Sequence, residues 1–264
     1  MIRKSLIIIP FTLCLIITDT RILWSQTGDP AFNFAVGTKY YSRFTAYGIN
    51  LSGDNPAWGL NAGLEHSSGL YGDIYYIRSI QSSNDEQQVA LDMGYQLEFS
   101  PRFLMYAELT HYQYSSDTLH AFAQFSNSFS LNANFDLSII DIGLSFDRFF
   151  GGSGATYFSV DISTFQHLGP LYLLPMMQVV FMSQTVEERY LDKGKGKKKD
   201  DENLVTTTLT GLSSTILTVV TILPVVENLN ITLVPSLIFY HQSELSVDSV
   251  QFIWNAGIRY RIYF

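Results

Sequence analysis

The sequence predicts an all-β protein, a transmembrane antiparallel up-and-down β-barrel of about 12 strands. Three observations lead to this fold class. Apolar and polar residues alternate with a period of two along much of the chain. Clusters of turn-forming residues divide the chain into segments of strand length. Beyond the N-terminal segment there is no run of about 18 apolar residues, so a transmembrane helix is not predicted.

Residues 1–26 have the composition of a secretory signal peptide. A basic start, "MIRKS", precedes the apolar core "LIIIPFTLCLIIT" and the short polar exit "RILWSQ". This core is shorter than the roughly 20 residues that cross a bilayer as a helix. The only cysteine, Cys14, lies inside it, so the remaining chain offers no disulfide and no cysteine-ligated metal site. We expect a signal peptide over 1–26 and an outer-membrane β-barrel domain over 27–264.

The alternation is regular in the segments 88–99, 103–114, 138–150 and 252–264. Such segments form strands with one apolar and one polar face, because successive side chains point to opposite sides. The segment 88–99 shows the two faces. One face carries Val89, Leu91, Met93, Tyr95, Leu97 and Phe99, and the other carries Ala90, Asp92, Gly94, Gln96 and Glu98.

The turn clusters allow the strands to be counted. They are "LSGDNP", "HSSG", "QSSNDEQ", "SPR", "SSDT", "FDL", "GGSG", "HLGP", "DKGKGKKKDDEN", "VVENLN" and "LSVDS". Beginning with "HSSG", every second cluster is a tight turn, while the others include longer and more charged segments. Bacterial outer-membrane barrels show this asymmetry, and an even strand number brings both chain ends to the same side.

The segment "LYLLPMMQVVFM" barely alternates, so a strand number between about 10 and 14 stays open. Pro175, Pro224 and Pro235 each remove a hydrogen-bond donor, and we expect them near strand ends or bulges.

A soluble β-sandwich or lipocalin-like barrel would also alternate, but it would carry a mainly charged outer face. Here the polar face is rich in Gly, Ser, Asn and Tyr, which suits a wet interior. The apolar face is rich in Tyr, Phe and Trp, which suits lipid with aromatic girdles. The net charge of -8 and the pI near 5.0 argue against nucleic-acid binding. The membrane barrel is therefore favoured.

The alternation places a set of charged residues on the inner face. Enclosed acids and bases either pair into a polar plug or line a narrow aqueous pore, and both alternatives stay open. The lumen-facing candidates are Lys39, Arg43, Glu65, Asp92, Glu98, Glu108, Asp141, Asp147, Asp161, Arg259 and Arg261.

One stretch, "EHSSG", has the residue types of a catalytic site. His66 two residues from Ser68 on a membrane barrel resembles the outer-membrane phospholipases, where an imidazole acts as base for a serine. The alternative is a periplasmic hairpin turn in which Gly69 provides a permissive dihedral angle. The other histidines lack metal-ligand spacing. We expect no enzymatic activity, no catalytic or metal-binding residues and no cofactor. The run "KGKGKKKDDE" is interpreted as a solvated loop or a contact to lipopolysaccharide phosphates.

The stretch "SRFTAYGINLSGDNPAWGLNAGLEHSSGLYGDIY" resembles the opening of the TorF-like porin family. That family has Arg where this chain has Tyr47. The resemblance covers roughly 40 residues and implies an outer-membrane barrel of porin type with no catalytic residues to carry over. The matching residues are Ser42, Phe44, Gly48, Pro56, Ala57, Ser68, Gly69 and Tyr71.

The C-terminal strand resembles the signature that the barrel-assembly machinery recognises, in which alternating apolar residues end on Phe. The residues of this assembly signal are Ile258, Tyr260, Ile262 and Phe264.

We expect a narrow porin for passive diffusion of small solutes in the outer membrane of a Gram-negative-type bacterium. The alternatives are a structural or adhesive barrel with a plugged lumen, or a phospholipase-like enzyme. The expected partners are the lipid bilayer, lipopolysaccharide, the barrel-assembly machinery and small solutes, and no nucleic acid.

Overall fold

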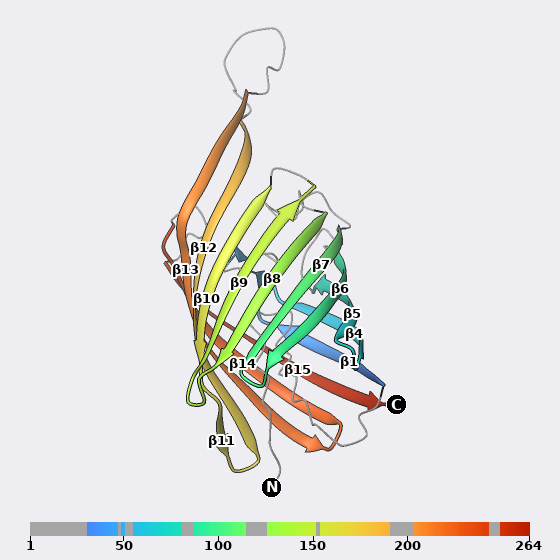
Figure 1. Ribbon diagram of the computed structural model, residues 1–264. Helices are drawn as coiled ribbons and strands as arrows, with labels where there is room; N and C mark the ends of the chain where they lie inside the picture. The colour runs from blue at the N-terminus through green and yellow to red at the C-terminus, as the bar shows by residue number, and fades with distance from the viewer. Residues whose placement is uncertain are drawn as a thin grey trace.

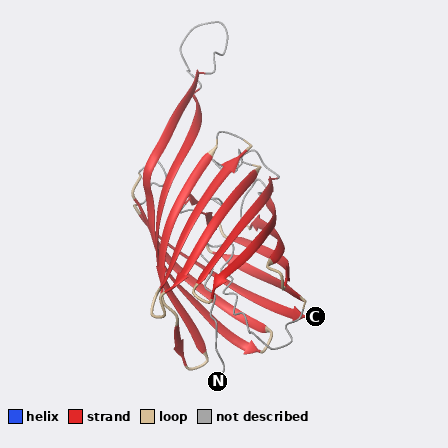
Figure 2. Ribbon diagram, in the orientation of Figure 1, coloured by secondary structure: helices blue, strands red, loops and turns tan. Residues whose placement is uncertain are grey.

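The computed structural model describes residues 31–46, 49–50, 55–80, 87–114, 126–151, 154–190, 203–242 and 249–264. These residues form a closed antiparallel barrel with 12 wall strands, which confirms the predicted fold class (Figure 1). Figure 2 shows only strands and loops in the described part of the chain. No described segment forms a helix long and apolar enough to cross a membrane.

Each wall strand pairs with the next wall strand along the chain. The sheet closes because β1 also pairs with β15, with Gly37 opposite Arg259. The short β11 (Gln166–Leu168) follows β10 and pairs with the same neighbour, β12. The wall strands are β1 (Phe32–Tyr41), β4 (Ala57–His66), β5 (Leu70–Ser79), β6 (Gln87–Ser100), β7 (Phe103–Tyr114), β8 (Asn127–Asp136), β9 (Asp141–Phe150), β10 (Ala155–Ser163), β12 (Leu171–Tyr190), β13 (Asn203–Val226), β14 (Leu229–Tyr240) and β15 (Val250–Tyr263).

The two ends of the barrel differ in the length of their connections. One end has the tight turns 67–69, 101–102, 137–140 and 227–228, together with the connection 164–170 that contains β11. The start of β1 and the end of β15 lie together at this end, where Phe32 and Phe264 exchange backbone hydrogen bonds of 3.0 and 3.1 Å. The longer connections lie at the other end, where β12 and β13 project beyond their neighbours (Figure 1). This is the arrangement that the turn clusters predict.

Exposure alternates along the strands as the sequence predicts. In β6, Ala90 and Asp92 are 2% and 7% exposed, whereas Leu91 and Met93 are 48% and 68% exposed. In a closed barrel the buried residues face the interior and the exposed residues face outwards. The outer surface is therefore apolar, as a lipid environment requires.

Strands β12 to β14 depart from this pattern, because they place aliphatic side chains on the inner face as well. This explains why the sequence around 171–182 barely alternates. The inward aliphatic residues, here called the apolar wall, are Leu174, Met176 and Val180 on β12, Ile216, Val220 and Ile222 on β13, and Val234 and Ile238 on β14.

The prolines lie only partly where the sequence predicts. Pro224 lies at a register shift near the end of β13, as expected. Pro175 and Pro235 lie inside β12 and β14, so the expectation of strand ends or bulges is wrong for them. Pro235 is accommodated by a local break: the β13–β14 pairing skips from Thr218–Ser236 to Thr221–Leu233. Because proline has no backbone N–H, the hydrogen bonds between β13 and β14 are interrupted over this short stretch.

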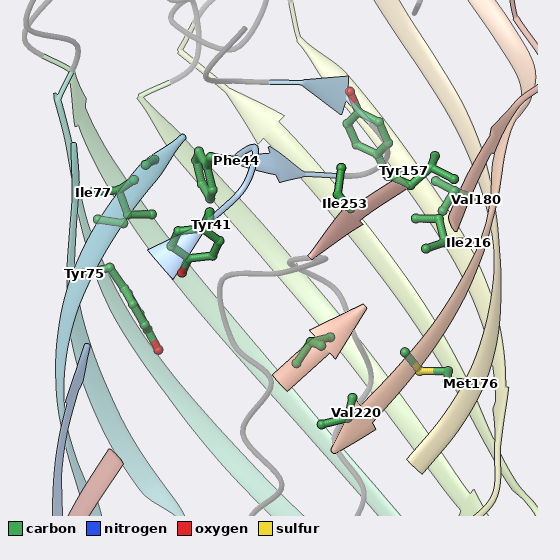
Figure 3. Packing of buried hydrophobic residues seen from close by; sticks show 14 of the residues in the cluster. Tyr41, Phe44, Tyr75, Ile77, Tyr157, Met176, Val180, Ile216, Val220 and Ile253 are labelled. Carbon is green, nitrogen blue, oxygen red and sulfur yellow. The ribbon is translucent and has the colours of Figure 1, made fainter. Parts of the chain in front are cut away.

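The connection after β1 turns into the barrel. Phe44 and Thr45 are almost fully buried, and the ring of Phe44 packs edge-on against Tyr41 at 5.4 Å (Figure 3). The connection continues through the short strands β2 (Thr45–Ala46) and β3 (Ile49–Asn50). Further buried rings lie on β7, β9 and β10, with Tyr112–Phe149 at 6.1 Å and Phe149–Tyr157 at 5.7 Å. We call the buried rings near the end of the barrel with the longer connections the aromatic collar; they are the pair Tyr41 and Phe44 and the group Tyr112, Phe149 and Tyr157.

Candidate functional site: the barrel interior

Three carboxylates lie on adjoining strands of the inner face and form what we call the acidic cluster: Asp73 on β5, Asp92 on β6 and Glu108 on β7. Asp73 and Asp92 are direct cross-strand partners, and Glu108 is paired with Gly94, two residues from Asp92. Directly paired and diagonal side chains on one face are within reach of each other.

Glu108 is held by two hydroxyl groups. The Tyr71 hydroxyl donates to Glu108 Oε2 at 3.0 Å, and the Thr110 hydroxyl lies 3.4 Å from Oε1. Tyr71 reaches Glu108 by lying flat over Gly94, where a Cβ atom would come within 2.3 Å of the Tyr71 ring. Gly94 therefore provides the space that brings a β5 side chain to a β7 carboxylate.

A second group of acids lies on β9 and β10. Asp141 is half-buried at the start of β9, and Asp147 and Asp161 are buried on the inner face. Asp161 covers its cross-strand partner Gly143, where a Cβ atom would approach the carboxylate within 2.3 Å. As in the acidic cluster, a glycine lets the opposite acid lie against the wall.

The basic residues of the interior lie on the two strands that close the barrel. Arg259 and Arg261 on β15 pair with Gly37 and Ala35, and Lys39 on β1 pairs with Gly257. Arg261 is buried, and Lys39 and Arg259 are half-buried. On the neighbouring β4, Glu65 accepts a hydrogen bond from Asn33 Nδ2 at 3.4 Å. The positive charges are thus gathered on one arc of the wall.

Two candidates lie elsewhere than the alternation suggests. Arg43 follows the end of β1 and belongs to the connection that turns inwards, so its placement does not come from strand alternation. Glu98 is exposed at the end of β6 with the tight turns, beside the register shift between Glu98 and Ser100. The sequence reasoning missed Asp73, although its position between Tyr71 and Tyr75 in "YGDIY" follows the same period-two rule.

The inner surface is divided into three sectors. The order of the wall strands places the acids on β4 to β10, the apolar wall on β12 to β14 and the bases on β15 and β1. Counted either way around the ring, β13 is six strands from β6. The acidic cluster and the apolar wall therefore lie on opposite sides of the enclosed space (Figure 1). The polar residues Gln178, Thr218 and Ser236 interrupt the apolar wall.

The His66–Ser68 pair lies in the tight turn between β4 and β5. His66 Nδ1 is 2.8 Å from Ser68 Oγ and accepts the Ser68 backbone N–H at 3.1 Å. The ring also packs edge-on against Phe32 at 4.8 Å. Within the described residues no carboxylate hydrogen-bonds to His66, so the third group that would orient a catalytic histidine is missing there. Local side-chain bonding in a turn accounts for the geometry.

The described residues contain no group of three or more His, Cys, Asp or Glu side chains that could hold a metal ion. The four residues of the expected assembly signal all lie on the outer face of the last strand or at its end, and are 42–62% exposed: Ile258, Tyr260, Ile262 and Phe264. The expected signal peptide over 1–26 and the lysine-rich run lie outside the described residues.

The barrel is similar to solved structures of porins. The KdgM porin aligns with a TM-score of 0.53 and 9% identity over 86% of this chain and 98% of that chain. The KdgM porin in complex with disordered oligogalacturonate aligns with a TM-score of 0.51, 9% identity and the same coverage. No family model matches the sequence, and no curated protein matches it. At this level of identity, the likeness to the porins establishes the fold of the chain.

Proposed function

We propose that this protein is a narrow outer-membrane channel for the passive diffusion of small solutes. The observation that carries the proposal is the inner face of the closed barrel, which holds acids, bases and neutral polar residues inside an apolar outer surface. Lining a lumen with charged and hydroxyl side chains is how channels favour water and ions. The eleven charged candidates and Asp73 are the residues that we assign to this lining or to its mouths.

The outer-membrane location rests on the outward band of apolar residues and on the difference between the two barrel ends. We further propose that residues 1–26 direct export, that the barrel-assembly machinery recognises the last strand, and that the longer connections face lipopolysaccharide. Membership of the TorF-like porin family is part of the same proposal. Fractionation of cells that express the chain tests the location: the protein should separate with the outer membrane and migrate differently in electrophoresis before and after heating.

The channel is tested by reconstituting the purified barrel in planar bilayers. We expect discrete conductance steps with a preference for cations, because acids outnumber bases on the inner face. A preparation unfolded by heat should give no steps. If the folded barrel stays silent at high protein load, the lumen is plugged and the structural or adhesive alternative replaces the channel.

We do not propose an enzyme. The hydrogen bond between His66 and Ser68 is the one observation that favours a phospholipase activity. Phospholipid hydrolysis by the folded wild-type protein that disappears in Ser68→Ala would establish that activity. Equal, background-level hydrolysis in both proteins is the result we expect.

A further inference from the structure

We propose that a groove in the outer surface of the barrel binds one acyl chain of a glycerophospholipid. The groove crosses β10, β12, β13 and β14, and its volume is about 480 Å³. This volume lies within the roughly 300–1,000 Å³ that is typical of ligand pockets. The groove lies outside the lumen, so the inference goes beyond the proposed channel function.

One side of the groove is a row of long apolar side chains. The register places them directly opposite one another from β10 to β15, because each residue pairs with the next across a strand boundary. Their side chains are 39–61% exposed, so the row faces outwards. The row consists of Ile162, Met177, Leu217, Leu237 and Phe252.

The floor of the groove is a neighbouring row with shorter side chains. Pro175 is directly opposite Val219 in the β12–β13 pairing. Thr218 pairs with Ser236, and in antiparallel strands this brings Val219 opposite Pro235. Val219 therefore stands between two prolines. Because proline and valine are shorter than leucine, methionine and phenylalanine, the surface is lower along this row than along the first.

The groove lies over the interrupted stretch of the β13–β14 pairing. On the inner side of this stretch, the hydroxyl groups of Thr218 and Ser236 hydrogen-bond at 2.9 Å, and both residues are buried. The two strands thus stay linked behind the groove. The feature is an indentation of the wall that is open to the outside, and a chain lying in it would contact three strands at once.

The chemistry of the lining favours a hydrocarbon chain as the occupant. Among the described residues that line the groove, none is charged, and the exposed ones are aliphatic or aromatic. The groove is continuous with the apolar outer surface, which is the surface that meets lipid in a membrane barrel. Within lipid, binding depends on van der Waals contact, so a groove that fits a chain holds it better than a flat wall does.

The position of the groove indicates the source of the chain. Ile140 in the turn 137–140 and Thr164 at the start of the connection 164–170 both line it, so it reaches the end of the barrel with the tight turns. Short turns face the periplasm in outer-membrane barrels. The periplasmic leaflet consists of glycerophospholipids, whereas lipopolysaccharide occupies the outer leaflet. This assignment of the leaflet rests on the proposed outer-membrane location.

The test is native mass spectrometry of the folded, lipid-free barrel in detergent, titrated with palmitoyl-oleoyl-phosphatidylethanolamine. We expect one retained lipid per barrel. Glycerophosphoethanolamine has the headgroup without the acyl chains and should not be retained. The absence of a retained lipid, or equal retention of the headgroup alone, would overturn the site. A preference for lipid A over phosphatidylethanolamine would overturn the assignment to a glycerophospholipid.

The decisive variant is Val219→Phe, compared with Val36→Phe as the matched control. Both variants add the same ring to an outward valine, since Val219 is 38% and Val36 is 42% exposed, but only Val219 lies in the groove. Val219→Phe should weaken lipid retention by at least about threefold, the effect of losing several carbon–carbon contacts. Val36→Phe should retain lipid like the wild type. Equal retention by both variants would mean that the lipid binds elsewhere on the wall.

A second pair of variants keeps the proposal testable if Val219→Phe does not fold. Leu237→Ala removes a side chain from the long row and should weaken retention, whereas Leu91→Ala removes an outward leucine from β6 and should not. An equal effect of the two would overturn the site.

The same spectra distinguish the lipid from a second copy of the chain. A mass of two barrels without lipid, converted to single barrels by Val219→Phe, would assign the groove to a dimer and overturn the lipid. Planar bilayers separate this inference from the channel. Conductance by a barrel that retains no lipid would overturn the groove site alone, whereas lipid retention by a silent barrel would overturn the channel and leave the site.

Discussion

The Tyr71 hydroxyl donates a hydrogen bond to Glu108 across two strand boundaries of the barrel wall, at 3.0 Å from Oε2. Tyr71 lies on β5 and Glu108 on β7, so the ring must cross β6, and it does so over Gly94. This places a fixed donor on one edge of the acidic cluster and holds the Glu108 carboxylate beside Asp92. The relationship depends on three residues from three strands and gives the first prediction.

Replacing Gly94 with Ala should displace Tyr71 and break its hydrogen bond to Glu108. The new Cβ atom would lie 2.3 Å from the Tyr71 ring, so the ring has to move. We expect the free energy of unfolding to fall by roughly 1–3 kcal/mol, the range for overpacking and for losing a hydrogen bond to a charged group. Urea unfolding of the variant and the wild-type barrel in lipid vesicles measures this difference in the free energy of unfolding.

Gly72→Ala is the matched control for Gly94→Ala. Gly72 lies on the adjoining strand β5, and a Cβ atom there would meet only the Asp92 carbonyl oxygen, at an ordinary distance of 3.4 Å. This variant should unfold like the wild type. Equal stability of all three proteins would show that the Tyr71 contact contributes nothing.

Period-two alternation was enough to predict the fold because a wall strand with lipid on one side and water on the other must alternate, as Leu91 and Asp92 do. The apolar wall could not be found this way. Leu174, Val220 and Val234 face inwards from strands whose outer faces are also apolar, so the alternation disappears. The acidic cluster depends on register: Asp73 and Asp92 meet only because the β5–β6 pairing aligns them, which no local pattern specifies.

Neutralising the basic arc should increase the preference of the channel for cations. Arg259→Gln combined with Arg261→Gln removes two positive charges from β15 and leaves Lys39 as the base of the arc that opposes the acids of β4 to β10. The reversal potential in a salt gradient should shift towards that of an ideally cation-selective pore. Arg148→Gln is the control, because this exposed residue bonds to Thr156 on the outer face and should leave selectivity unchanged. A shift of the same size in the control would exclude the assignment of the arc to the lumen.

Phe44→Ala should widen the end of the barrel with the longer connections. Phe44 is 3% exposed and packs on Tyr41 within the aromatic collar. Apolar rings at a constriction narrow the path and disfavour water in it, so their removal should raise the single-channel conductance. Phe150→Ala removes an equal ring from the outer face, where Phe150 is 42% exposed, and should leave conductance unaltered. The collar would not be the constriction if both variants conduct like the wild type.

Deleting Phe264 should impair assembly of the barrel in the outer membrane. Its backbone exchanges hydrogen bonds of 3.0 and 3.1 Å with Phe32, and the two rings stack at 6.0 Å, so the residue joins the last strand to the first. Its side chain is 62% exposed, which leaves it accessible to an assembly factor. We expect a smaller heat-resistant fraction in isolated membranes, measured by electrophoresis with and without heating.

Phe264→Tyr separates the two roles of the last residue. It keeps the backbone hydrogen bonds and an aromatic ring, so it should assemble nearly as well as the wild type, whereas Phe264→Ala keeps the backbone bonds and loses the ring. If the alanine variant assembles as poorly as the deletion, the ring is what matters. Should it assemble like the wild type, the closing hydrogen bonds to Phe32 account for the effect of the deletion. Full assembly of the deletion variant would show that neither the ring nor these bonds are needed.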